Sequence, residues 1–143
     1  MTSIGAQEES IHSAEANRAL VDIGRVLSRE PFLDIAFDRV VAMMKTIVSA
    51  DRIVITSFDS DGRMLVDEHI SGTGIPGRTE ENVLPIEGTI SGYVMDHPES
   101  LVHTASNSEE ILKRVPDMKV VLDAGFRSGI SCALRSQERH IGV

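Results

Sequence analysis

The stretch from Leu84 to Val102 constrains the fold most, because its punctuation predicts a strand, a tight turn, a short helix and a second strand in close succession. Pro85 and Gly88 mark the turn. Thr89 is suited to cap the helix, since its hydroxyl can accept a hydrogen bond from the free N–H groups of the first turn. The sequence His97-Pro98 ends the helix, because proline disfavours a helical residue before it. Three apolar residues share one face of this helix by their spacing: Ile90, Tyr93 and Val94.

The remaining elements follow an α+β order, with two helices, a hairpin, a linker rich in short helices and a second hairpin. Residues 1–10 are predicted to be a frayed tail. Residues 71–82 are rich in glycine and predict a long mobile loop or flap. Helical or alternating apolar periodicity predicts helices over 11–28, 31–49 and 108–115, and strands over 52–58, 64–70, 101–104, 126–134 and from 141.

The strand at 52–58 carries apolar or β-branched residues on both faces, so both faces require cover. Asp59 to Gly62 provide the hairpin turn that returns the chain. We therefore expect a central antiparallel sheet with long helices on one face. Short helices and loops would roof a pocket on the other face.

Composition excludes several classes of protein. The chain has 143 residues, of which 41% are hydrophobic, enough for one domain with one core. No apolar run is long enough to span a membrane. A net charge of −8 argues against a nucleic-acid surface. The only cysteine, Cys132, cannot form an internal disulfide, so we expect a cytoplasmic setting.

The 84–102 segment, together with the sequence Ala-Gly-Phe-Arg-Ser at 124–128 and Ile-Gly-Val at 141–143, resembles a GAF domain. The resemblance covers roughly residues 18–143, and residues 1–17 would be a polar tail and the start of an N-terminal helix. It implies a non-catalytic sensory domain of a cytoplasmic signalling protein, such as a sensor histidine kinase of a two-component system or a nucleotide-cyclase regulator. Such a domain binds a small molecule and relays binding through its terminal helices to an attached output domain. The alternative is a GAF-fold dimerisation module without a ligand.

The same resemblance bears on how the chain ends and how it assembles. The residues at 141–143 would open the family's last strand, which pairs beside the central one, and the closing helix is absent. We expect that the chain is part of a longer protein, or that a second copy fills the gap. Leu20, Ile23, Gly24 and Leu27 form a helical stripe. This stripe is explained either by packing on its own domain or by a homodimer through the N-terminal helix.

The residues give little sign of catalysis or of a cofactor. Bilin-binding members of the family have a Cys followed by a His in the pocket. In this chain Ala133 follows Cys132, so no bilin is expected. Methionine-sulfoxide reductases of the family use several cysteines, so this activity is not expected either. His69, His97 and His103 show no ligand spacing, which disfavours haem and other metals.

The candidate ligand-binding residues are those that the predicted strands and helices bring toward the roofed face. Arg127 lies in the motif that resembles cyclic-nucleotide-binding GAF domains, where an inward guanidinium could hold a carboxylate or phosphate. The alternative for Arg127 is an edge position with an ion pair to Asp123 or Glu138. The full set of pocket candidates is Thr56, Phe58, Thr89, Ile90, Thr104, Ile111, Val120, Arg127 and Ser128.

Overall fold

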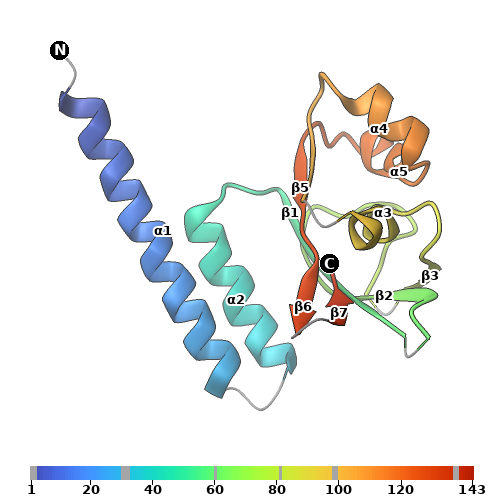
Figure 1. The fold of residues 1–143 in the computed structure, drawn as a ribbon, viewed down its shortest axis with the longest axis horizontal. Coiled ribbons are helices and arrows are strands. Elements are labelled where there is room, and N and C mark those ends of the chain that lie inside the picture. Colours follow the sequence, from blue (N-terminus) through green and yellow to red (C-terminus); the bar gives the residue numbers. More distant parts are fainter. Residues whose placement is uncertain (1–2, 30–32, 60, 81, 98–99, 137–138) are drawn as a thin grey trace. The chain divides into compact units, whose positions relative to one another are not determined.

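The computed structural model of the chain describes residues 3–29, 33–59, 61–80, 82–97, 100–136 and 139–143. It divides into two compact units, residues 1–53 and residues 54–143, each of which is described by itself. The described residues contain five helices and an antiparallel sheet (Figure 1). The predicted α+β class is therefore confirmed.

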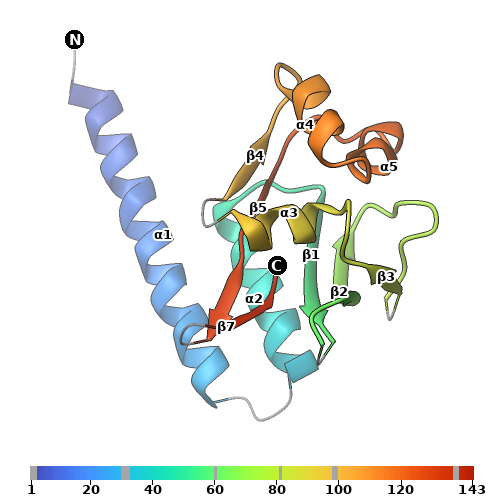
Figure 2. The same ribbon diagram turned by 45° about the vertical axis from the view of Figure 1, so that its right-hand side comes forward.

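The first unit consists mainly of two helices, α1 (Ser3–Arg29) and α2 (Leu33–Ile47), which lie side by side and run in opposite directions (Figure 2). The helix predicted over 31–49 is present with narrower bounds. Helix α1 begins at Ser3, so the prediction of a frayed tail over residues 1–10 is wrong. The apolar periodicity that marked the helix from Ile11 gave no information on the polar turns before it.

The second unit is built on a five-stranded sheet with the order β3-β2-β1-β7-β6. Every strand pairing described is antiparallel, and β7 pairs with β1 through Ser57 and Gly142, as expected for the last strand. The five strands are β1 (Arg52–Phe58), β2 (Met64–Gly72), β3 (Val83–Pro85), β6 (Leu134–Ser136) and β7 (Arg139–Gly142).

The turn between β1 and β2 lies where the sequence predicted it, and one carboxylate holds it. Asp59 Oδ1 accepts hydrogen bonds from the backbone N–H groups of Arg63 at 2.8 Å and Met64 at 3.0 Å. Gly62 takes the positive φ of 66° that the turn requires. The backbone hydrogen bond from Met64 is the main cause that lowers the pKa of Asp59.

Three short helices and a two-stranded ribbon make up the rest of this unit, and we call them the upper layer (Figure 2). Its elements are α3 (Ile90–Asp96), β4 (Leu101–His103), α4 (Ser108–Arg114), α5 (Met118–Asp123) and β5 (Gly129–Ser131). They enclose a core of buried apolar side chains contributed by Val94, Leu101, Ile111, Val115 and Met118.

Helix α3 has the local structure that the sequence predicted. The Thr89 hydroxyl accepts a hydrogen bond from Gly92 N at 3.1 Å and donates one to the Ile86 carbonyl at 2.6 Å. His97 is the C-cap residue. The helix is attached to the sheet through Ser91, whose Oγ lies 3.4 Å from Thr56 Oγ1.

Two predictions for the C-terminal third are wrong. The single strand predicted over 126–134 is two strands in different sheets, because β5 pairs with β4 and β6 pairs with β7. The apolar run at Val120 to Leu122 belongs to helix α5, which the sequence analysis did not predict.

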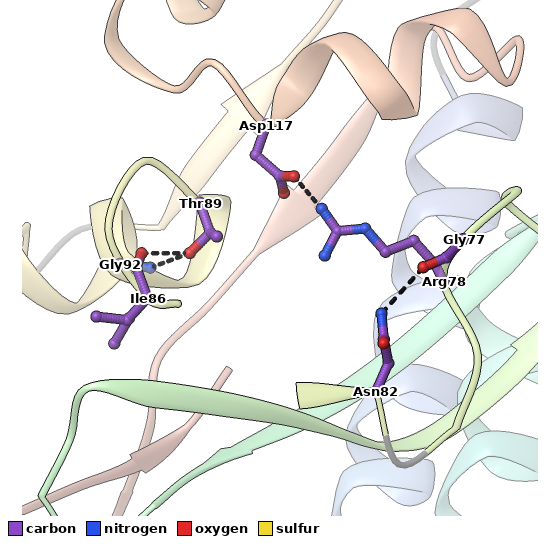
Figure 3. A network of polar contacts seen from close by, with 7 residues as sticks. All are labelled: Gly77, Arg78, Asn82, Ile86, Thr89, Gly92 and Asp117. Carbon is purple, nitrogen blue, oxygen red and sulfur yellow. Dashed lines mark hydrogen bonds and ion pairs between the residues drawn. The ribbon is translucent and has the colours of Figure 1, made fainter. Parts of the chain in front are cut away.

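The predicted loop at 71–82 is anchored to the upper layer. Strand β2 extends to Gly72, and Ile75 is buried. Arg78 forms an ion pair with Asp117 at the start of α5, as Figure 3 shows. Burial raises the pKa of Asp117, and the charge of Arg78 opposes this effect. Asn82 Nδ2 donates to the Gly77 carbonyl at 3.0 Å and closes the loop's own turn.

Candidate functional site

A hollow of about 180 Å³ lies among α3, β4 and α4, and we call it the inner hollow. Its apolar lining includes Leu101, Ile111 and Val115, which are buried members of the core. Tyr93 and the exposed Val102 line it as well. Three polar side chains complete the lining: Asn107, Glu110 and Arg114. Small-molecule sites usually combine apolar side chains with a few polar groups, and the inner hollow, which opens to solvent, has both.

The charged pair of the inner hollow comes from successive turns of α4. Arg114 Nη2 lies 2.6 Å from Glu110 Oε1, and both side chains are largely exposed, at 58% and 65%. Arg114 Nη1 also donates to the Tyr93 hydroxyl at 3.5 Å. The Tyr93 contact and then the Glu110 charge raise the pKa of Arg114, so the guanidinium stays charged.

Asn107 is held in place by the strand beside it. Its Nδ2 donates to the Val102 carbonyl at 3.1 Å, and its Oδ1 accepts from Thr104 N at 2.7 Å. These two contacts fix the amide and leave Arg114 and Glu110 as the polar groups that can exchange partners. Asn107 precedes α4 but makes no side-chain hydrogen bond to the helix N-terminus.

A second hollow of about 350 Å³ lies beside α3, and we call it the outer hollow. Tyr93 and Arg114 line both hollows. The Tyr93 and His97 rings are stacked with centroids 3.9 Å apart and planes 11° apart. The other lining residues are Gly62, Ile86, Glu87, Gly88, Thr89, Gly92, Met95, Asp96 and His97.

Two of the predicted pocket residues line a hollow. Ile111 lines the inner hollow and Thr89 lines the outer one. Neither hollow has any of the other predicted residues in its lining, namely Thr56, Phe58, Ile90, Thr104, Val120, Arg127 and Ser128. Thr56 is buried and contacts Ser91 and the Val143 carbonyl, the latter at 3.3 Å, so its hydroxyl joins α3 to β1 and the chain end.

The described contacts of Arg127 are with backbone carbonyls and not with Asp123. Its Nη1 donates to the carbonyls of Leu122 at 2.8 Å and Phe126 at 3.3 Å, and the residue is exposed. Asp123 forms an ion pair with Lys119 at 2.6 Å. Glu138 lies outside the described residues. Arg127 therefore satisfies carbonyls at the end of α5.

His103 is buried, and its Nε2 has no hydrogen-bond partner. The ring lies over Gly129 of β5, where an added Cβ would come within 2.4 Å of Cε1. Burial lowers the pKa of His103, so the neutral imidazole is favoured. Among the residues whose side chains are described, no group of three His, Cys, Asp or Glu could hold a metal ion.

Sequence reasoning missed the polar residues of the inner hollow. The residues Glu110 and Arg114 are spaced as an i,i+4 helix pair, which is the signal for an ordinary surface ion pair. Nothing in that spacing indicates that Tyr93, a residue of another helix, lies beside Arg114.

No family model and no curated protein matches the chain. No helix in the described part of the chain is both long and apolar enough to cross a membrane.

Proposed function

We propose that residues 18–143 form a non-catalytic sensory module of the GAF type, which binds a small molecule in the inner hollow. In a signalling protein, such as a sensor histidine kinase, binding in the hollow would favour one conformation of the module. This conformational change would then be passed to an attached output domain. A cytoplasmic setting belongs to the same proposal.

The observation that carries this proposal is the composition of the inner hollow. Its lining combines buried apolar side chains with an Arg and a Glu that are not committed to the protein core. The antiparallel sheet, in which β7 lies beside β1, and the short helices of the upper layer support this proposal.

A residue at the edge of the hollow provides the test. Val102 is 50% exposed, so replacing it with Trp adds bulk at the lining without disturbing a buried position. We expect that protein purified from cells carries a small molecule detectable by native mass spectrometry. We expect Val102→Trp to abolish its retention, because the new ring occupies the space.

Ile130 offers a matched control, because it lies directly across from Val102 on β5 and is 70% exposed. It does not line the inner hollow. Ile130→Trp therefore adds the same bulk to the same ribbon and should leave retention unchanged. Equal loss of the ligand in both variants, or equal retention in both, would contradict the inner hollow as the site.

A second candidate function is homodimerisation through the helices of the first unit. Leu20 and Val21 of α1 are 60% and 55% exposed, and Ile35 and Val48 are also exposed. Gly24, one turn after Leu20, has open space around it. Apolar side chains gathered on a long helix are typical of a helix-pairing surface.

We expect light scattering to report a dimer whose dissociation increases on dilution. Replacing Leu20 and Val21 together with Glu should shift the protein to a monomer, because four like charges would then meet across the interface. Replacing the exposed Val83 of β3 with Glu is the control and should have no effect. A wild-type protein that stays monomeric at all concentrations would rule out this second function.

A further inference from the structure

We infer that the molecule taken up by the inner hollow is a small monocarboxylic acid with one ring-sized apolar body. The inference rests on the proposed function, and it names the class of ligand for that same site. It follows from the volume of the hollow, the chemistry of its lining and the exposed ion pair that Arg114 forms with Glu110.

The volume limits the apolar part of the ligand. Dry apolar cavities of about 150 Å³ take up a benzene molecule. At about 180 Å³, the inner hollow has room for one six-membered ring or a branched chain of similar size. Because the hollow opens to solvent, this volume limits only the part of the ligand that lies inside it.

The lining favours an apolar body over a polar one. Leu101, Ile111 and Val115 offer only carbon atoms, and each belongs to the buried core. A polar group placed against them would lose its hydration without gaining a hydrogen bond. The Tyr93 ring adds an aromatic surface to the same lining.

Arg114 supplies the partner for a carboxylate. Its guanidinium contacts Tyr93 and lines both hollows, whereas Glu110 lines only the inner one. Its partner Glu110 is 65% exposed, and an ion pair in such a position contributes little to stability. A carboxylate can therefore replace Glu110 at the guanidinium, with two parallel hydrogen bonds.

The charges around Arg114 favour a single negative charge on the ligand. The ligand would displace one carboxylate, that of Glu110, from the guanidinium. A ligand with one negative charge then neutralises Arg114 as Glu110 does in the free protein. A phosphate ester would bring a second negative charge close to Glu110, which repels it. An amine would have to displace Arg114 from Glu110, and the charge of the displaced guanidinium would repel it.

The test measures binding of four probes to the whole chain: benzoate, phenylacetate, benzamide and benzylamine. Titration calorimetry gives the affinity, and amide chemical shifts of Ile111 and Arg114 report whether the probe enters the inner hollow. We expect the two acids to bind at least tenfold more tightly than the neutral and cationic probes, which is the factor equivalent to about 1.4 kcal/mol.

Two variants test the contribution of the charged residues separately from that of the apolar lining. Glu110→Gln removes the competing carboxylate and should tighten binding of the acids severalfold. Arg114→Met keeps the apolar stem and should weaken the acids about tenfold, without effect on benzamide. Both side chains are largely exposed, so the variants should unfold at the wild-type temperature.

The outcomes separate the two proposals. If all four probes bind equally and Val102→Trp excludes them, the carboxylic-acid inference is overturned while the small-molecule site remains. If Arg114→Met leaves the acids unaffected, the inference also fails. If no probe binds and no molecule is retained from cells, both the inference and the proposed function are contradicted.

Discussion

Replacing Gly92 with alanine is expected to destabilise residues 54–143 by about 2–3 kcal/mol, as overpacking a tight contact does. The Cβ of an alanine at this position would lie 2.3 Å from the carbonyl oxygen of Ile86 and 3.2 Å from its carbon. These are backbone atoms and cannot rotate away. Chemical denaturation followed by circular dichroism measures the loss.

The damage should spread beyond the contact itself, because the same carbonyl is already engaged. Ile86 O accepts a hydrogen bond from the Thr89 hydroxyl at 2.6 Å (Figure 3). It also accepts one from Thr89 N at 3.2 Å. Moving this carbonyl to admit a methyl group disturbs the N-cap of α3, and loss of an N-cap costs about 1 kcal/mol. Gly92 and Tyr93 also line the outer hollow, so its shape should change as well.

Gly74 is the matched control in the same unit. A Cβ there would meet no atom within 4 Å. Gly74→Ala should therefore change the free energy of unfolding by less than about 0.5 kcal/mol. If the two alanine variants have the same stability, the close approach of α3 to Ile86 is not a constraint on the fold.

The sequence predicted the region around Gly92 well because its structure is determined locally. The cap at Thr89, the stop after Asp96 and the glycine at 88 with a φ of 75° all depend on residues within a few positions. The β1–β2 hairpin is a second example, since Asp59 holds its turn through neighbouring N–H groups. Helix α2 was predicted from a periodicity repeated over several turns.

The break between β5 and β6 was not predicted, because it depends on partners distant in sequence. Alternation continues through Cys132 and Ala133, so the pattern alone describes a single strand. The chain changes sheets there because Ser131 pairs with Leu101 whereas Leu134 pairs with Gly142. Helix α5 was missed because six residues, 118–123, provide less than two turns of periodicity.

The inner hollow does not lie where the sequence predicted a pocket, because none of its lining residues belongs to the five-stranded sheet. Of the candidate residues, Ile111 of α4 is in its lining. Arg114 was not predicted, because charge spacing on a helix cannot show which other helix lies beside it. The resemblance directed attention to Arg127, whose described partners are carbonyl groups near the end of α5.

His103 leads to a second large effect, an acid-induced loss of stability. Its ring is buried and Nε2 is unpartnered, so the folded state disfavours the protonated form and the pKa of His103 is lowered. In the unfolded chain a histidine has its usual pKa of about 6.5. Above that pH His103 is neutral in both states and the free energy of unfolding has its full value. It falls as the pH decreases from there toward the pKa of His103 in the folded state. The free energy of unfolding can fall by at most about 1.4 kcal/mol per pH unit, because only one proton is involved.

His103→Leu should remove this pH dependence and raise the stability at pH 7.5 by about 1 kcal/mol. The substitution replaces a buried polar group that lacks a partner with an apolar side chain of similar size, and an unsatisfied group costs about 1–3 kcal/mol. Urea titrations of both proteins at several pH values between 5 and 7.5 provide the measurement. Parallel curves for the two proteins would contradict a buried, neutral His103.

Asp117 must be separated from His103 in this experiment, because its effect has the opposite sign. Burial raises the pKa of Asp117, so its ionised form is disfavoured by folding and acidification through that pKa adds stability. Asp117→Asn removes this contribution and keeps a side chain of the same shape beside Arg78. In that background His103→Leu should have the same effect at each pH as it has in the wild-type background, because desolvation alone lowers the pKa of His103 and charged groups do not contribute. If the effect of His103→Leu disappears in the Asp117→Asn background, the two residues are coupled, and His103 alone does not account for the acid sensitivity.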